Sequence, residues 1–210
     1  MKSFQTIRLA ALGVALVSAT ALVACSDTTA QGTGTLQLQL TDAPFSSDSV
    51  SRVDVYVVRV DAKAAETETA EMADGTSDAD AMTSGWTTVA TPNRLIELLA
   101  LRNGITTTLG ETKIAAGSYR SFRLVIDPSK SSVTLKNGTV LTSGSTPNVS
   151  FPSAARSGIK VKLDRPITIA TDGTTLAVVD FDVSQSFVLR GNTIAESGLI
   201  FKPVIRGTTR

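Results

Sequence analysis

Hydrophobic and polar residues alternate with a period of two along most of the chain after residue 35. Near the start of this region three leucines alternate with polar residues, which predicts a strand with one apolar face (Leu36, Leu38, Leu40). Within 53–60 the alternation slips by one residue at Val57 and Val58, which indicates a bulge or a strand covered on both faces. Further alternating runs at 122–126 and 159–163 extend the prediction of strands along the chain.

Turn signals separate these runs. Asn137-Gly138 and Asp172-Gly173 each lie between two apolar runs and supply the positive φ angles of tight turns, so both predict β-hairpins. Residues 93–101 (NRLIELLAL) fit a helical turn as well as a strand, and they predict one short helix or a crossover. Together the patterns predict an all-β fold: a single antiparallel β-sandwich over 35–208, of transthyretin-like or immunoglobulin-like type.

The N-terminal segment has the composition of a signal peptide over residues 1–24. Lys2 and Arg8 precede an apolar run of small residues at 9–21. This run is shorter than the roughly 20 residues that a transmembrane helix needs, so a permanent membrane-spanning anchor is the weaker interpretation. Residues 25–34 follow, and after the cysteine they are small, polar and glycine-containing, which predicts a flexible tether.

The end of the apolar run, Leu22-Val23-Ala24-Cys25, resembles the lipobox of bacterial lipoproteins. This resemblance implies cleavage before Cys25 and acylation of that residue, hence a membrane anchor. A lone thiol in an exported protein would otherwise stay unpaired. The alternative is an ordinary secretory signal cut after Ala21, which leaves a free thiol. Ser26 stands where an Asp would favour inner-membrane retention, so the expected location is the cell envelope, with the outer membrane favoured.

Composition excludes several classes of function. The chain has no histidine and one cysteine, which excludes imidazole-based catalysis, histidine-ligated metals, intrachain disulfides and iron–sulfur clusters. We therefore expect no catalytic residue, no metal and no cofactor. The charges nearly cancel, with 20 basic and 19 acidic side chains, and the sequence has no cluster of basic residues. We therefore do not expect nucleic acid as a partner. Residues 64–84 contain six acidic residues and no basic one, which predicts a long solvated loop.

Three aspartates are candidate site residues. Asp42 precedes Ala43-Pro44, where an aspartate is suited to a cation or to sugar hydroxyls but more often caps its own backbone. Asp180 and Asp182 are two positions apart on one strand, and a separation of about 6–7 Å lies within the range of glycosidase carboxylates. Calcium or another ligand is a second hypothesis for this pair. The favoured interpretation is a structural ion pair, for which basic residues are available on other strands (Arg123, Lys160, Lys162).

The single tryptophan is a further candidate. Trp86, together with Tyr56 and Tyr119, would suit a stacking platform for sugar rings, whereas packing at the core or its rim is the favoured interpretation.

Several short segments occur in a characteristic order: 40–44 (LTDAP), 54–60, Trp86, 96–99 (IELL), 116–119 (AGSY) with 123–124, 157–160 (SGIK), 180–182 (DFD) with Ser186, and 202–206 (KPVIR). Together they resemble the family catalogued as domain of unknown function 4382, which occurs in exported proteins that are often lipoproteins. The resemblance covers nearly the whole mature chain and implies a β-sandwich with no established activity.

These observations lead to one functional expectation and one alternative. The expectation is a lipid-anchored, non-enzymatic β-sandwich of the cell envelope that binds or scaffolds a polysaccharide or an envelope protein. The alternative is a calcium-dependent binding module or a carboxylate-dependent hydrolase that uses Asp180 and Asp182.

Overall fold

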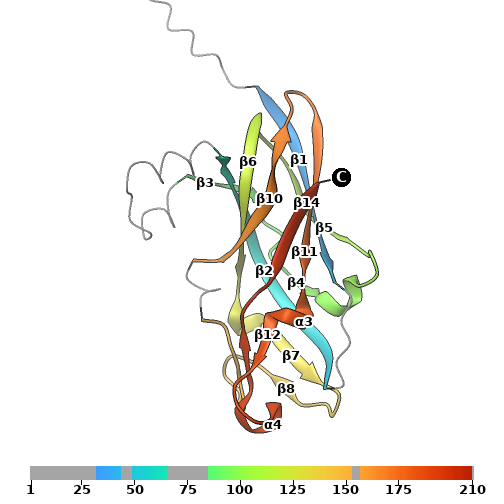
Figure 1. The fold of residues 1–210 in the computed structure, drawn as a ribbon, viewed down its shortest axis with the longest axis vertical. Coiled ribbons are helices and arrows are strands. Elements are labelled where there is room, and N and C mark those ends of the chain that lie inside the picture. Colours follow the sequence, from blue (N-terminus) through green and yellow to red (C-terminus); the bar gives the residue numbers. More distant parts are fainter. Residues whose placement is uncertain (1–31, 44–48, 66–84, 153–156, 210) are drawn as a thin grey trace, which may run out of the picture. The chain divides into compact units, whose positions relative to one another are not determined.

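The computed structural model describes residues 32–43, 49–65, 85–152 and 157–209. The signal peptide, Cys25 with the tether up to residue 31, and residues 66–84 of the acidic loop lie outside this part. The described residues form an all-β, sandwich-like fold, as the sequence predicts (Figure 1). None of their helices is long and apolar enough to cross a membrane.

The first sheet has four strands in the order β14-β11-β1-β5. Its members are β1 (Thr33–Asp42), β5 (Thr107–Ala115), β11 (Thr174–Phe181) and β14 (Ile205–Thr209). β1 begins two residues before the domain boundary expected from sequence, because Thr33 and Gly34 already pair with the end of β5. β1 pairs with β11 in parallel, whereas its pairing with β5 is antiparallel, so the predicted antiparallel sandwich contains one parallel pair at its centre.

The second sheet has the order β10-β6-β2-β7-β8 and is built around one long strand, β2 (Val50–Ala64). Its other members in this order are β6 (Gly117–Ile126), β7 (Ser132–Leu135), β8 (Val140–Leu141) and β10 (Ile159–Ile169). β3 (Trp86–Ala90) and β4 (Arg94–Glu97) also pair with β2.

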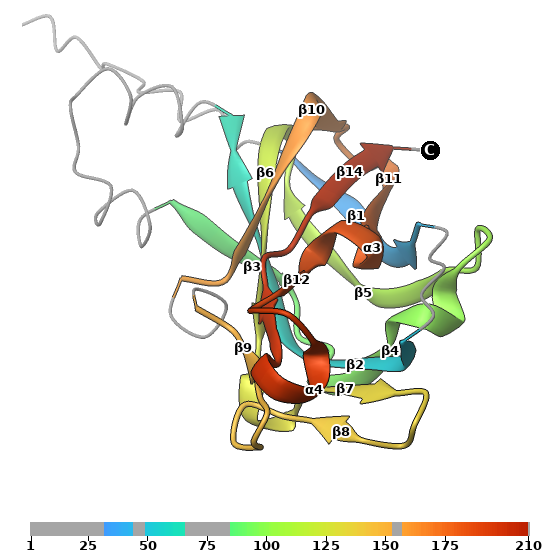
Figure 2. The ribbon, with the colours of Figure 1, turned by 60° about the horizontal axis from the view of Figure 1, so that its bottom comes forward.

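A small third sheet and four helical turns complete the described part. The sheet has the order β12-β13-β9 and consists of β9 (Val149–Ser150), β12 (Phe187–Leu189) and β13 (Leu199–Phe201). The turns are the 3₁₀ segments η1 (Leu98–Leu101) and η2 (Pro128–Lys130) and the short helices α3 (Val183–Ser186) and α4 (Ile194–Ser197). In Figure 2 α4 lies at the same end of the domain as β7 and β8.

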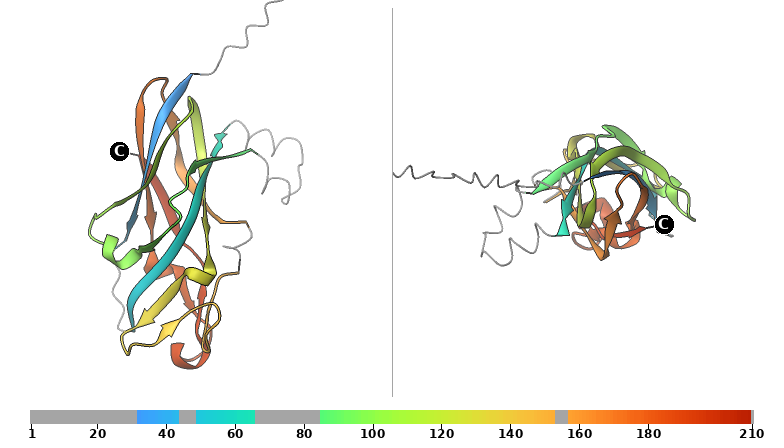
Figure 3. Two further views of the ribbon diagram at one scale, coloured as in Figure 1. Left: turned by 180° about the vertical axis from the view of Figure 1, so that it is seen from behind. Right: turned by 90° about the horizontal axis from the view of Figure 1, so that it is seen from above.

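The two main sheets enclose one apolar core and approach each other along two seams. Seen from above in Figure 3, the sheets curve around this common core. At one seam β10 lies beside β14, and at the other β3 lies beside β5. A glycine occupies each seam: a Cβ at Gly207 would meet the side chain of Leu163, and a Cβ at Gly110 would lie 2.8 Å from that of Ala90. The missing side chains therefore permit the close approach of the sheets.

Several sequence predictions are confirmed. The slip at Val57 and Val58 is a bulge, since the pairing of β2 with β6 shifts register there. Asn137-Gly138 turns the hairpin between β7 and β8, where Gly138 has a φ of 87° and the Leu135 amide donates to the Thr139 carbonyl at 2.8 Å. Residues 93–101 divide between the short strand β4 and the helical turn η1.

The second predicted hairpin is wrong. Asp172 does adopt the left-handed conformation, with a φ of 55°. However, β10 pairs with β6 in the second sheet, whereas β11 pairs with β1 and β14 in the first. The turn therefore carries the chain from one sheet to the other. It is held by β1 instead, since the Thr35 amide donates to the Gly173 carbonyl at 2.8 Å.

The seam between β3 and β5 gives a testable prediction. Replacing Gly110 by alanine should lower the free energy of unfolding by about 1–3 kcal/mol, because the new methyl group overlaps the small, rigid side chain of Ala90. Gly144→Ala is the matched control, since a Cβ there meets nothing within 4 Å, and it should change stability by less than about 0.5 kcal/mol. Urea unfolding of both variants is the measurement, and equal stability of the two would contradict the close approach.

Candidate functional site

Asp42 is a carboxylate in a row of core residues. It ends β1, and its side chain continues the alternation that buries the three β1 leucines. Only 3% of its surface is exposed. The Val183 amide, the first of helix α3, donates to Asp42 Oδ1 at 3.1 Å. This partner lies 141 positions further along the chain. The local cap expected from the sequence concerns residues 44–48, which lie outside the described part.

Asp182 caps the same short helix. Its Oδ1 accepts hydrogen bonds from the Gln185 amide at 3.1 Å and from Ser184 Oγ at 2.5 Å. Its Oδ2 accepts from Gln185 Nε2 at 2.6 Å. Both oxygens of Asp182 are therefore engaged in holding the first turn of α3.

Asp180 lies next to these groups at the end of β11. Its cross-strand partner in β14 is Arg206. Asp180 Oδ1 is buried and finds no hydrogen-bond partner within the described ranges, and the same is true of Asp42 Oδ2. The structure thus brings together three of the four residues that the sequence singled out for ligand binding, and two of them keep an unsatisfied buried oxygen.

Burial dominates the electrostatics of this acidic cluster, which consists of Asp42, Asp180 and Asp182. Burial raises the pKa of Asp42 to about 7, although the hydrogen bond from Val183 opposes the shift. The charges of Asp180 and Asp182 raise this pKa further, and Arg102 lowers it. Burial also raises the pKa of Asp180, with a second contribution from Asp182 and an opposing one from Arg206.

The contacts of the cluster can be compared with the three hypotheses from the sequence, namely a metal site, a hydrolase site and a structural ion pair. Among the residues that the structure describes, no group of three or more His, Cys, Asp or Glu side chains is placed to hold a metal ion. Asp182 already uses both oxygens in capping, which disfavours a role for it as a nucleophile or base. Arg123, one of the expected ion-pair partners, binds Asp61 instead, at 2.7 Å.

Trp86 lies in a separate network on the outer face of the second sheet. Trp86 on β3 pairs with Lys63 on β2. Two residues along, Thr88 on β3 pairs with Asp61 on β2, which in turn pairs with Arg123 on β6. The guanidinium of Arg123 lies 4.6 Å from the centroid of the indole ring, and the Lys63 ammonium lies 5.6 Å from it. The ring therefore packs against cations within the protein.

The two tyrosines do not join Trp86 in a stacking platform. Tyr119 is buried and donates to the Ala115 carbonyl at 3.0 Å. Tyr56 pairs with β4 rather than β3, and its hydroxyl donates to the Asn93 carbonyl at 2.9 Å. The packing interpretation of Trp86 accords with this arrangement.

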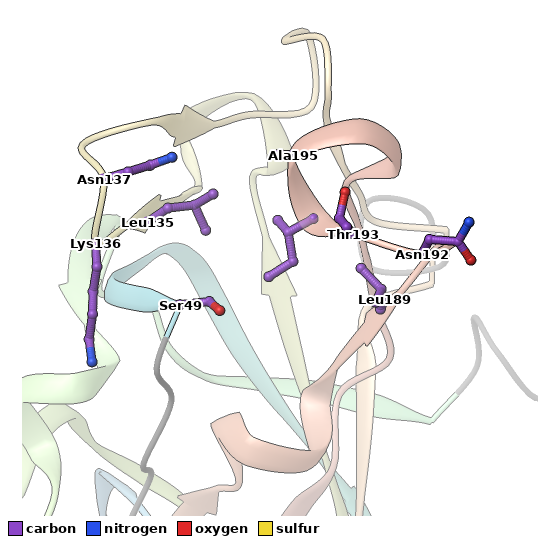
Figure 4. A pocket seen from close by; sticks show the side chains of 9 residues that line it. Ser49, Leu135, Lys136, Asn137, Leu189, Asn192, Thr193 and Ala195 are labelled. Carbon is purple, nitrogen blue, oxygen red and sulfur yellow. The ribbon is translucent and has the colours of Figure 1, made fainter.

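A pocket of about 570 Å³ lies at the end of the domain that carries α4 and the β7–β8 hairpin (Figure 4). Three segments line it: the start of β2, the β7–β8 turn, and the stretch from β12 into α4. The lining residues are Ser49, Leu135, Lys136, Asn137, Leu189, Asn192, Thr193, Ile194 and Ala195. Leu135 and Leu189 lie on opposite walls.

The pocket combines aliphatic walls with amide and hydroxyl groups, which is the usual character of a ligand site. The Lys136 amide donates to the Ser49 carbonyl at 2.8 Å and joins two of the lining segments. Thr193 caps α4 by accepting from the Glu196 amide at 3.3 Å. Sequence analysis identified none of these residues as ligand-binding. Leu189 is 42% exposed in an edge strand, but this exposure is visible only in the structure.

The fold defines the protein as an all-β domain whose candidate site is a pocket at one end of the sheets. The chain belongs to the family described as Domain of unknown function (DUF4382), whose family model matches residues 33–203. Searches of curated proteins and of solved structures returned no match.

The network around Trp86 gives a second prediction. Asp61 is 1% exposed and accepts from Arg59, Arg123 and Thr88. Asp61→Ala should lower the free energy of unfolding by about 3–5 kcal/mol, because it leaves the Arg123 guanidinium, whose side chain is only 11% exposed, without its counter-charge. Glu111→Ala removes an acid whose hydrogen bond to Gln37 is exposed, and it should cost less than about 0.5 kcal/mol. Chemical denaturation followed by Trp86 fluorescence measures both, and a loss below about 1 kcal/mol for Asp61→Ala would contradict this role.

Proposed function

We propose that this protein is a lipid-anchored, non-enzymatic binding module of the cell envelope, and that it holds a segment of another envelope protein in the pocket between β7, β12 and α4. The anchor rests on Cys25 and the signal peptide before it. The absence of histidine from the whole sequence and the engaged oxygens of Asp182 support a non-enzymatic role.

The position of the pocket carries the proposal. β1 begins beside the β5–β6 and β10–β11 turns, since the Ala116 amide donates to the Gly32 carbonyl at 2.6 Å and the Asp172 amide to the Thr33 carbonyl at 2.8 Å. The elements that line the pocket lie at the other end of the sheets, where Figures 1 and 2 show α4 beside the β7–β8 hairpin. Seven positions separate Cys25 from Gly32, and they span at most about 25 Å. An anchor at Cys25 would thus keep the β1 end of the domain within about 25 Å of the membrane, at the end opposite the pocket.

The lining of the pocket favours a polypeptide over a polysaccharide. None of the nine lining side chains is aromatic, so the pocket lacks a flat ring on which a sugar would stack. Leu135, Leu189 and Ile194 offer aliphatic contacts, while Asn137 and Asn192 offer amides that both donate and accept. Aliphatic walls beside amide groups suit the side chain and the backbone of an extended peptide.

The anchor is tested by replacing one residue. Cys25→Ser removes the thiol that would carry the diacylglycerol, so the variant should move from the membrane fraction to the soluble fraction of lysed cells. Detergent phase partitioning of the wild-type protein and the variant measures the change. Unchanged membrane partitioning of Cys25→Ser would show that the chain has no lipid anchor at this residue.

The pocket is tested by capture from envelope extracts with the full-length protein. Leu189→Glu places a charge on the pocket wall at an exposed position, and it should lower the yield of a captured protein at least about tenfold. Ile105→Glu is the matched control, because Ile105 is 57% exposed and does not line the pocket. A glycan array is read in parallel. Binding to a glycan with no captured protein would replace the polypeptide by a polysaccharide, and no binding in either assay would leave only a passive structural role.

A further inference from the structure

β5 is an edge strand of the first sheet, because only β1 pairs with it. In an antiparallel pair, residues that bond the neighbouring strand alternate with residues whose backbone groups point away from it. Ala116 is of the first kind, since its amide donates to the Gly32 carbonyl at 2.6 Å. Counting back from Ala116 in steps of one, Lys113 and Glu111 are of the second kind. Their amides and carbonyls therefore point away from β1, along the free side of β5.

Side chains of the same domain bound this free side at both ends. Arg94 Nη2 donates to the Thr108 carbonyl at 2.5 Å, and the Tyr119 hydroxyl donates to the Ala115 carbonyl at 3.0 Å. Between these two points the strand is open: within the described ranges, no hydrogen bond reaches the backbone groups on the free side of residues 111 and 113. Both residues are exposed. Their backbone groups are therefore available to another strand.

β3 approaches β5 from the core and not along this free side. Gly110 pairs with Leu38, whose side chain is in the core, so a Cβ at Gly110 would also point into the sandwich. There it would meet Ala90 of β3. A groove of about 290 Å³ runs between the two strands and is lined by residues 88–91 and 109–112. This groove leaves room beside Thr112 for an added strand.

The exposed side chains of β5 carry opposite charges on either side of Thr112. Gln37 Nε2 donates to Oε2 of Glu111 at 2.7 Å, and in the described part of the chain neither Glu111 nor Lys113 has an ion-pair partner. A second copy of β5 can pair with the first around a twofold axis. An axis through Thr112 sets Glu111 of each copy opposite Lys113 of the other. An axis through Glu111 or Lys113 would instead set like charges opposite each other, which is unfavourable.

We propose that two copies of this chain pair through their β5 strands around a twofold axis at Thr112. The four-stranded first sheets of the two copies then join into one continuous sheet. Each opposed pair of Glu111 and Lys113 exchanges both of its backbone hydrogen bonds, and the side chains of the pair form an ion pair across the interface. None of the residues that line the pocket takes part, so this association is independent of the proposed function.

Sedimentation of the purified full-length protein in excess detergent, at increasing protein concentration, tests the association. The wild type should show a monomer–dimer equilibrium. Glu111→Lys and Lys113→Glu should each raise the dimer dissociation constant at least about tenfold, because each substitution sets like charges opposite each other at both pairs. Lys202→Glu is the matched control, because it reverses an exposed lysine outside β5 and should leave the constant unchanged.

A mixture of the two variants separates the pairing of charges from a general loss of affinity. Glu111→Lys has two basic side chains at the interface, whereas Lys113→Glu has two acidic ones. An equimolar mixture should therefore form a heterodimer about as tight as the wild-type dimer. A wild type that is monomeric at every concentration would overturn the proposal, and so would a mixture that is as monomeric as each variant alone.

Hydrogen exchange locates the interface. The Glu111 and Lys113 amides should exchange at least about tenfold more slowly in the dimer than in the monomer, because they gain hydrogen bonds only on association. The Thr112 amide points toward β1 in both states, so its exchange should change much less. A dimer in which the Glu111 and Lys113 amides are both unprotected would have another interface and would overturn the pairing of β5 strands.

Discussion

The hydrogen bond from the Val183 amide to Asp42 joins β1, an inner strand of the first sheet, to the start of α3. It places a carboxylate at the end of a leucine row, where an ionised group is costly unless it is paired. The first amide of α3 supplies that partner, and Asp182 caps the same turn by accepting from the Gln185 amide. The direction of α3, and through β12 one wall of the pocket, depends on this junction.

The strands were predictable because their pattern is local. Alternation in β1, the slip at Val57 and the Asn137-Gly138 turn each specify a feature within a few residues. The pairing of strands is not local in this sense. Asp172-Gly173 has the chemistry of a hairpin turn, yet the neighbours of β10 and β11 are set by which apolar faces close the core. The parallel pairing of β1 with β11 is likewise a property of the whole sandwich.

The candidate site was predictable only in part, for the same reason. Asp42, Asp180 and Asp182 stand out as acids beside apolar strands, and the structure brings them together because β1 and β11 are neighbours. The bonds that they make to α3 depend on that pairing, so the sequence alone did not indicate them. The pocket draws on three distant segments of ordinary polar and aliphatic residues, so no local pattern in the sequence indicates it. Trp86, the most conspicuous residue in the sequence, lies away from both sites and packs against Arg123.

The account depends on the burial of the Asp42 carboxyl group, which raises the pKa of that group to about 7. Site-resolved titration of the aspartate side-chain carboxyl carbons by NMR, assigned with Asp42→Asn, tests it most directly. The account predicts that the Asp42 signal titrates with a pKa of about 7 and that the pKa of Asp180 lies above its ordinary value of 3.8. A midpoint for Asp42 near its ordinary value of 3.8 would contradict the account.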